Sequence, residues 1–146
     1  MKIAIIGYGK MGQSVEETAL LLGNEIVVRI DSEKDWELYH KNLTGADVAI
    51  EFSTTGTVVS NILKCFKINL PVVTGTTAWE DQLEMIKQKC LIGGHSLFVA
   101  SNFSLGVNLF FNLNRYFSKI MNGFSQYDIS INETHHTRKL DKPSDG

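Results

Sequence analysis

The chain has 146 residues, of which 43% are hydrophobic and 21% are charged, and its formal net charge is -2. This composition is globular, and the small negative charge without a basic stripe argues against nucleic acid as a main partner. No apolar run approaches the roughly 18 residues of a membrane span. We therefore expect no nucleic acid and no membrane as partners, and a cytoplasmic location. Cys65 and Cys90 lack metal-like or Cys-x-x-Cys spacing, and we expect small buried thiols.

Predicted strands and helices alternate along residues 1–104. Short apolar runs rich in β-branched residues predict buried strands at 2–7, 25–31, 46–53, 70–75 and 95–101. Helical spacing of apolar residues predicts helices at 10–22, 58–66 and 80–90, with a loop and short helix at 32–43. Such alternation implies right-handed crossovers and a parallel sheet. We therefore expect an α/β fold with helices on both faces of the sheet.

The pattern changes near Ser104. Residues 105–121 form a long apolar helix pattern that includes Phe110, Phe111 and Phe117, and residues 127–136 alternate as a two-faced strand does. We place a domain boundary here, with a dinucleotide-binding domain in 1–104 and the beginning of an α+β substrate domain in 105–146. One helix and one strand lack a partner to pair with, so we expect this second domain to be incomplete.

The stretch "GYGKMG" follows the first predicted strand and opens the first helix. Gly7 permits a tight turn, Gly9 allows backbone amides to approach a pyrophosphate, and Gly12 lets the helix pack closely on the strand. Asp31 ends the second strand, where an acidic side chain binds an adenosine ribose. These features together predict a Rossmann-type site, although glycines in an ordinary strand–helix turn are the alternative. The Asp31 carboxylate favours NADH over NADPH, and the nearby Lys34 weakens that preference.

Three other small polar segments follow predicted strands. They are residues 52–55, 74–78 and 100–106. The carboxyl ends of parallel strands meet at one edge of a sheet, where ligands bind. Each segment alone fits an ordinary loop, and Ser53 or Thr54 could be a helix N-cap. Together they predict a cleft.

The stretch "ETHHTRKLDKPSDG" concentrates titratable groups at the end of the last predicted strand. His135, His136 and Lys139 precede a Pro-Ser turn. An acid and a cation in one loop suit a polyanionic substrate that is protonated as it is reduced. Solvated histidines and a surface pair of Lys139 with Asp141 are the structural alternatives. We expect no metal site, because neighbouring histidines on a strand point opposite ways and no cysteine lies close in sequence.

Four motifs occur in the same order as in the dihydrodipicolinate reductase family. They are "GYGKMG", "GTT" after the fourth strand, "SNFSLG" after the fifth, and "ETHHTRKLDKPS". The chain resembles that family over its whole length. The resemblance implies a homotetrameric NAD(P)H-dependent reductase of a small cyclic dicarboxylate, 4-hydroxy-tetrahydrodipicolinate, in bacterial lysine and diaminopimelate synthesis.

The resemblance also implies roles for single residues. His135 would be the general acid and Lys139 its catalytic partner, while His136 and Ser144 would bind the substrate. Motif and resemblance together predict the residues that contact the dinucleotide, namely Gly7, Gly9, Lys10, Met11, Gly12, Asp31, Phe52, Ser53, Gly75, Thr76, Thr77, Ala100, Ser101, Asn102 and Phe103.

Three positions depart from the family pattern. Asp145 and Gly146 stand where the family has a glycine and a threonine that hold a substrate carboxylate, and an aspartate would repel that carboxylate. Ala78 stands where the family usually has a glycine after "GTT", which is a milder change. The family's substrate domain continues beyond this point, so we expect residues 1–146 to be a fragment or a shortened protein. As given, residues 1–146 should fold in their N-terminal part and lack reductase activity.

Two other functions compete with this prediction. One is a dinucleotide-dependent reductase of the aspartate or homoserine dehydrogenase type, whose chemistry does not require the histidine pair with Lys139. The other is a non-catalytic module that binds NADH, for which His135 would have no bearing on turnover.

Overall fold

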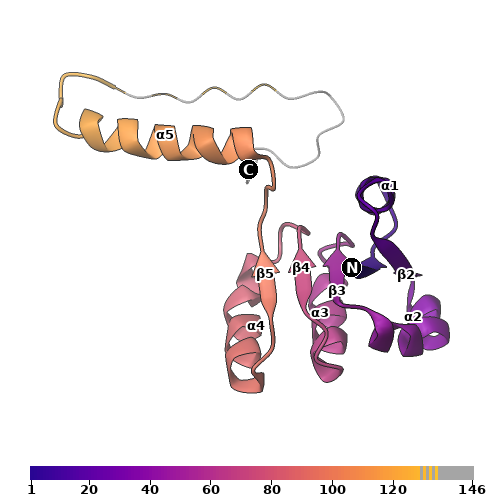
Figure 1. Ribbon diagram of the computed structural model, residues 1–146. Helices are drawn as coiled ribbons and strands as arrows, with labels where there is room; N and C mark the ends of the chain where they lie inside the picture. Colours follow the sequence, from indigo (N-terminus) through magenta and orange to yellow (C-terminus); the bar gives the residue numbers. More distant parts are fainter. Residues whose placement is uncertain (129, 131, 133, 135–146) are drawn as a thin grey trace. The chain divides into compact units, whose positions relative to one another are not determined.

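The computed structural model describes residues 1–128, 130, 132 and 134, and Figure 1 shows the arrangement of the elements. The chain divides into two compact units, Met1–Ala100 and Ser101–Gly146. Each unit is described by itself.

The first unit contains a parallel sheet of five strands in the order β2-β1-β3-β4-β5. The strands are β1 (Lys2–Ile6), β2 (Glu25–Ile30), β3 (Val48–Glu51), β4 (Val72–Thr74) and β5 (Leu97–Val99). All five coincide with the predicted strands and are shorter at their ends. The strand order reverses between β1 and β3, and open α/β sheets bind ligands at such a switch point.

Helices connect the strands at nearly the predicted positions. They are α1 (Lys10–Leu21), α2 (Glu33–Tyr39), α3 (Val58–Lys67) and α4 (Glu80–Gly93), with a 3-10 helix η1 (His40–Gly45) after α2. Helices α3 and α4 lie side by side along the sheet (Figure 1). Gly94 ends α4 in the left-handed conformation with φ 63°, which an achiral residue adopts at low cost.

Alternate residues of β1 enter two different cores. Ala4 and Ile6 pack in one core with apolar residues of α2, α3 and α4, whereas Ile3 and Ile5 pack in the other with Ala19 of α1. Successive side chains of a strand point to opposite faces, so β1 is covered on both sides. This confirms a parallel sheet with helices on both faces. Each fully buried isoleucine contributes about 1.5–3 kcal/mol of transfer free energy.

The second unit contains α5 (Leu105–Met121), which begins and ends at the predicted residues. Ser104 caps the helix, because its hydroxyl accepts a hydrogen bond from the Val107 amide at 3.4 Å. The apolar side chains of α5 include Phe110, Phe111 and Phe117, and all three are exposed in this structure. Of the strand predicted over 127–136, residues 127, 128, 130, 132 and 134 are described and none of them is in a strand, and the other five lie outside the described residues.

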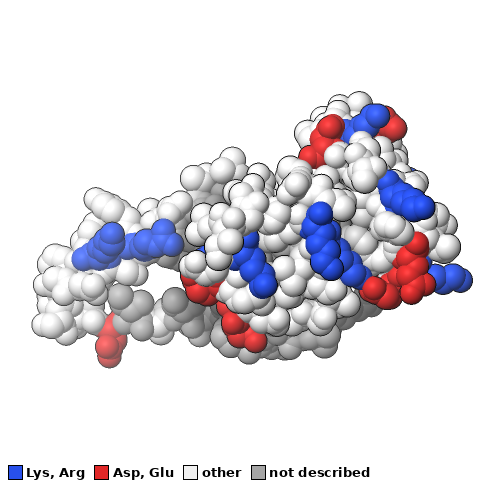
Figure 2. Space-filling model, turned by 90° about the horizontal axis from the view of Figure 1, so that it is seen from below, with Lys and Arg blue, Asp and Glu red and all other residues white. Residues whose placement is uncertain are grey.

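The surface carries charges of both signs. On the face drawn in Figure 2, lysine and arginine side chains and aspartate and glutamate side chains lie in small groups among uncharged residues. Among the described residues, the helices are all too short or too polar to cross a membrane.

Candidate dinucleotide-binding site

The loop between β1 and α1 accepts only glycine at two of the three glycine positions of the motif. Gly7 has φ +86°, and a Cβ built there would lie 2.2 Å from the carbonyl oxygen of Phe52. A Cβ on Gly12 would lie 2.1 Å from the carbonyl oxygen of Gly7. A Cβ on Gly9 meets nothing within 4 Å. Gly7 and Gly12 therefore serve the packing of the loop, whereas Gly9 leaves open space above the backbone.

The N-terminus of α1 offers free amides beside that open space. Gly9 is the N-cap residue and makes no side-chain cap, and the bond from the Gln13 amide to the Gly9 carbonyl closes the first helical turn at 3.0 Å. The amides of Lys10, Met11 and Gly12 precede that bond. A helix N-terminus with free amides and a partial positive charge suits a phosphate group.

Asp31 holds the same loop from the end of β2. Its Oδ1 atom accepts a hydrogen bond from the backbone amide of Tyr8 at 2.6 Å. Tyr8 is the residue between the first two glycines of the motif, so Asp31 ties the loop to β2. The predicted ribose-binding residue and the glycine loop are therefore in direct contact.

An ion pair outside the motif fixes the other side of Tyr8. The Tyr8 hydroxyl donates to Glu16 Oε2 at 2.5 Å, and the Arg29 guanidinium binds Glu16 through two nitrogens, with Nε 2.6 Å from Oε2. The bonds from Arg29 first and from Tyr8 second lower the pKa of Glu16 to about 2. The accepting Glu16 carboxylate is the main reason why the pKa of Tyr8 is raised. The sequence pattern did not indicate these contacts among Tyr8, Glu16 and Arg29.

A first cleft of about 240 Å³ opens between the ends of β1, β2 and β3. Its lining includes Gly7, Asp31, Ser32, Glu33, Trp36 and Ser53. The described residues that line it include two acidic side chains and no lysine or arginine. An acidic cleft of this kind suits a ribose diol rather than a phosphate.

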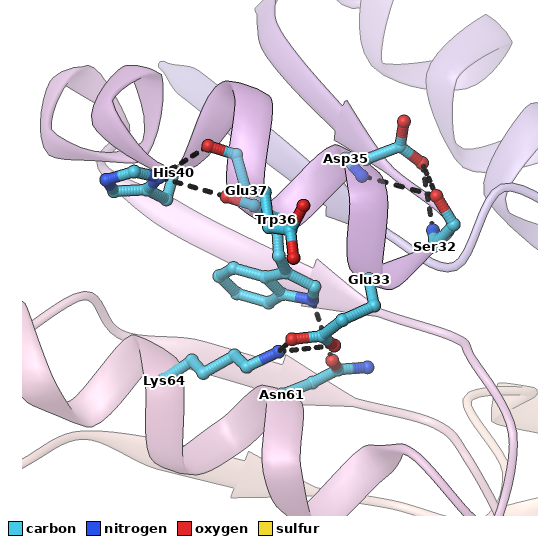
Figure 3. A network of polar contacts seen from close by, with 8 residues as sticks. All are labelled: Ser32, Glu33, Asp35, Trp36, Glu37, His40, Asn61 and Lys64. Atoms are coloured by element: carbon cyan, nitrogen blue, oxygen red, sulfur yellow. Dashed lines mark hydrogen bonds and ion pairs between the residues drawn. The ribbon is translucent and has the colours of Figure 1, made fainter.

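Ser32, which lines this cleft, forms a capping box with Asp35 at the start of α2, as Figure 3 shows. The Ser32 hydroxyl accepts from the Asp35 amide at 3.2 Å, and Asp35 Oδ2 accepts in return from the Ser32 amide at 2.9 Å. The helix α2 therefore begins at Glu33, whose carboxylate pairs with Lys64 Nζ at 2.6 Å. The Glu33 side chain is 73% exposed, so this pair contributes little to stability.

Trp36 forms the wall of the first cleft. The indole is buried, its Nε1 donates to Asn61 Oδ1 at 2.9 Å, and Lys64 Nζ lies 4.8 Å from the centre of the ring (Figure 3). His40 Nδ1 lies 3.0 Å from the Trp36 carbonyl oxygen where α2 ends. Lys64 is therefore engaged by Glu33 and by the indole.

A second cleft of about 570 Å³ lies on the other side of the glycine loop. It is lined by Gly9, Lys10, Met11, Phe52, Ser53, Thr54, Thr55, Gly75, Thr76 and Thr77. A Cβ on Gly75 would lie 2.1 Å from the Phe52 ring, so the two loops approach closely here. The structure thus brings together the predicted residues of three separate loops.

Comparison with known proteins supports these motifs. Residues 1–103 match the family model for the dihydrodipicolinate reductase N-terminus, and residues 106–146 match the model for its C-terminus. The chain belongs to the dihydrodipicolinate reductase family.

Named relatives of the family are similar over nearly the whole chain. The 4-hydroxy-tetrahydrodipicolinate reductase of Christiangramia forsetii is 43% identical over 144 residues, which are 99% of this chain and 59% of the relative. The enzyme of the same name from Staphylococcus saprophyticus is 35% identical over 150 residues, covering 99% of this chain and 60% of the relative. The chain therefore spans about three fifths of the length of these relatives.

A solved structure shows the same fold. It is described as a dipicolinate-bound dihydrodipicolinate reductase from Paenisporosarcina sp. TG-14, and it is 24% identical to this chain. The TM-score is 0.70, and the match covers 99% of this chain and 62% of that one. The parallel sheet and its crossovers are therefore those of the dihydrodipicolinate reductase fold.

Beneath the two clefts of this reductase-family chain lies Glu51, which sequence analysis did not single out. Its carboxylate is fully buried at the end of β3. Oε1 accepts from the Ser53 amide at 3.1 Å and from Asn61 Nδ2 at 3.4 Å, and also from the Ser53 hydroxyl. Oε2 accepts from the hydroxyls of Thr74 at 2.6 Å and Thr76 at 2.8 Å. The acidic residue within the otherwise apolar stretch "VAIEF" was the available signal.

The remaining predicted dinucleotide contacts lie at or beyond the end of the first unit. The amide of Ala100 donates to the Thr74 carbonyl at 3.2 Å. Ser101, Asn102 and Phe103 belong to the second unit, where Asn102 Oδ1 accepts from the Ser104 amide at 2.7 Å. Ala100, which belongs to the first unit, does not line either cleft.

The predicted catalytic and substrate-binding residues of the family lie outside the described residues. They are His135, His136, Lys139 and Ser144. Within the described part of the chain, no group of three His, Cys, Asp or Glu side chains is arranged to hold a metal ion. Cys65 is buried, and burial first and the Glu51 charge second raise the pKa of its thiol to about 12. Cys65 is therefore a core residue and no nucleophile.

Proposed function

We propose that residues 1–104 bind NAD(P)H and that residues 105–146 begin the substrate domain of a cytoplasmic 4-hydroxy-tetrahydrodipicolinate reductase. Such an enzyme reduces a small cyclic dicarboxylate in lysine and diaminopimelate synthesis. The observation that carries the proposal is the pair of clefts on either side of the glycine loop, which share Ser53. Family membership supports the choice of reaction.

The residues of the clefts fit a dinucleotide. The first cleft takes the adenosine half, with Asp31 accepting hydrogen bonds from the ribose. The pyrophosphate lies over Gly9, where no protein atom would meet a Cβ and where the amides of Lys10 and Met11 are free. The second cleft takes the nicotinamide half. Once bound, the reduced cofactor supplies a hydride.

The first cleft favours NADH over NADPH. A 2′-phosphate placed near the Asp31 ribose contact would approach two carboxylates, Asp31 and Glu33, and would be repelled. Lys64 already pairs with Glu33 at 2.6 Å and 2.7 Å, so its charge is not available to a phosphate without breaking that pair. The acidic lining therefore strengthens the preference for NADH that Asp31 alone predicts.

Our proposal for the substrate rests on the family motif. His135 holds the proton that the reduced ring receives, because an imidazolium has a suitable pKa near neutral pH. Lys139 stabilises the negative charge that develops on the ring. His136 and Ser144 bind the substrate. The complete enzyme is a homotetramer.

Titration of NADH and NADPH tests the cofactor assignment. Asp31→Ala should lower the affinity for NADH by about tenfold or more, because hydrogen bonds to a charged group contribute about 1.5–3 kcal/mol. The same substitution should lower the affinity for NADPH less. Asp31→Asn is the matched control, because its amide oxygen still accepts from the Tyr8 amide while the charge is gone. Asp31→Asn should reduce the difference between the affinities for NADH and NADPH. If the ratio of NADH to NADPH affinity is unchanged in Asp31→Ala, then Asp31 does not bind the ribose.

Turnover tests the catalytic roles, in a protein of full family length that carries this segment. His135→Ala and Lys139→Ala should each lower kcat about 10²-fold or more, since general acid–base groups contribute about 10²–10⁴. The affinity for NADH should stay the same in both variants. Wild-type rates in both would show that the assigned roles are wrong.

A further inference from the structure

Glu51 joins two loops that carry the proposed cofactor-binding residues. One carboxyl oxygen holds the loop after β3 through the Ser53 amide and hydroxyl, and the other holds the loop after β4 through the Thr74 and Thr76 hydroxyls. Ser53 lines both clefts and Thr76 lines the second. A buried carboxylate with a donor at each lone pair is fully satisfied, so this arrangement is rigid.

The donors on the two oxygens differ in kind. Oε1 accepts from the Ser53 hydroxyl and also from two permanent donors, the backbone amide of Ser53 and the side-chain amide of Asn61, whose orientation is set by the Trp36 indole. On Oε2, both donors are hydroxyls, which can turn and accept instead. Both hydroxyls donate to Oε2 in this structure.

The direction of the Thr76 hydroxyl has a consequence for the second cleft. Its proton is used on Glu51 Oε2 at 2.8 Å, so the oxygen can only accept from a ligand. Ser53 Oγ offers less to a ligand, because it already accepts from Asn61 Nδ2 at 3.1 Å and from Thr57 Oγ1 at 3.0 Å. Thr74 is fully buried. Through Thr76, Glu51 therefore determines that this part of the second cleft offers a ligand a hydrogen-bond acceptor.

We propose that Glu51 is a positioning residue for the nicotinamide half of the cofactor. It clamps the loops after β3 and β4 together, and it makes Thr76 present a hydrogen-bond acceptor to the carboxamide N–H of the nicotinamide. The inference rests on the proposed function, because it assumes that the second cleft receives the nicotinamide half.

Glu51→Gln separates this role from a general structural one. Only the hydroxyls can reverse, so the new amide nitrogen takes the place of Oε2 while the amide oxygen still accepts from the Ser53 and Asn61 amides. The first cleft therefore keeps its anchor, and the Thr76 hydroxyl turns its proton outward. NADH affinity should fall roughly three- to tenfold, the size of one hydrogen bond, and ADP-ribose affinity should stay within about twofold.

The measurement is a calorimetric titration of NADH and of ADP-ribose, which lacks only the nicotinamide. Glu84→Gln, on the exposed surface of α4, is the matched control and should bind both as the wild type does. A loss of equal size for both ligands in Glu51→Gln, or no loss for either, would overturn the inference. If the wild type does not bind NADH, the proposed function fails and the inference fails with it.

If Glu51→Gln does not fold, two variants of Thr76 test the same inference. Thr76→Val keeps the shape of the side chain and removes the hydroxyl, and it should reproduce the selective loss of NADH affinity. Thr76→Ser keeps the hydroxyl and should restore NADH affinity to within about twofold of the wild type. Equal NADH affinity in a folded Thr76→Val variant and in the wild type would overturn the inference.

Discussion

The two clefts of the first unit are built on different principles. In the first cleft, the carboxylates of Asp31 and Glu33 line the wall themselves and can meet a ligand directly. In the second, no acidic side chain is among the described lining residues, serine and threonine residues form much of the wall, and the carboxylate of Glu51 is buried and bonded to two of them, Ser53 and Thr76. An acidic group at the surface of a cleft selects by its charge, whereas a buried one selects by directing its neighbours' protons. Substitutions can test this difference.

The largest effect should come from the glycine loop that both clefts share. Gly12→Ala puts a Cβ 2.1 Å from the Gly7 carbonyl oxygen, and that backbone must move. We expect a loss of about 3 kcal/mol in the free energy of unfolding, as for overpacked cores, and a loss of NADH and ADP-ribose binding alike. Urea unfolding and titration of both ligands measure the two effects.

Gly9→Ala is the control for that substitution. Gly9 has φ -74° and open space at its Cβ position, so alanine should change the unfolding free energy by less than about 1 kcal/mol. Its methyl group would occupy the place proposed for the pyrophosphate, and NADH should bind more weakly. Normal NADH affinity in this variant would place the pyrophosphate elsewhere.

A smaller effect should follow from Glu16→Gln, which acts on the first cleft through the Tyr8 loop. The pKa of Glu16 in the folded chain is about 2, below its ordinary value of 4.5. The stabilisation is therefore complete above about pH 4.5 and is lost as the pH falls toward 2. The Arg29 side chain is 45% exposed, and solvent weakens its attraction to Glu16. We therefore expect Glu16→Gln to lower the free energy of unfolding by only about 1 kcal/mol at pH 7.

Urea unfolding at several pH values checks this expectation. The difference between wild type and Glu16→Gln should shrink steadily between pH 4.5 and pH 2. A difference that stays constant over that range would mean that the Glu16–Arg29 pair does not stabilise the loop through its charge.

The smallest effect concerns Ala78, which directly follows the residues of the loop after β4 that line the second cleft. Ala78 has φ 63°, a left-handed conformation that costs a residue with a Cβ roughly 1–2 kcal/mol. Ala78→Gly relieves this strain and loses part of the gain to the greater freedom of the unfolded chain, so we expect about 0.5 kcal/mol of net stabilisation. Asn69→Gly is the control, because asparagine adopts its φ of 53° more readily. If Ala78→Gly is less stable than the wild type, then the left-handed conformation of Ala78 is not strained.

Most elements of the first unit were predictable because they depend on local pattern. Continuous apolar runs mark strands that are buried on both faces, and β1 and β3 are examples. The boundaries of α5 were predicted correctly, since Ser104 is an N-cap residue and the apolar spacing persists to Met121. The serine and aspartate three residues apart at Ser32 and Asp35 also indicated the start of α2, but this signal was missed.

The contacts that join distant segments could not be predicted in this way. Nothing in local spacing pairs Glu51 with Thr74 and Thr76, which lie on another strand and its loop. The same holds for the bond between Trp36 and Asn61. The glycine motif and Asp31 identified the clefts because the geometry of a strand–turn–helix unit is itself local. The chemistry beneath the clefts depends on strand order, which the sequence pattern did not specify.

The strand order also constrains when the sheet can form. β1 lies between β2 and β3, with Lys2 paired to Glu25 and Ile3 paired to Val48. Because every pairing is parallel, no local hairpin can start the sheet, and each pair needs a complete crossover first. During synthesis at about 5–20 residues per second, the apolar strand β1 therefore waits a few seconds for its second partner. Throughout that interval it is a natural binding segment for a chaperone.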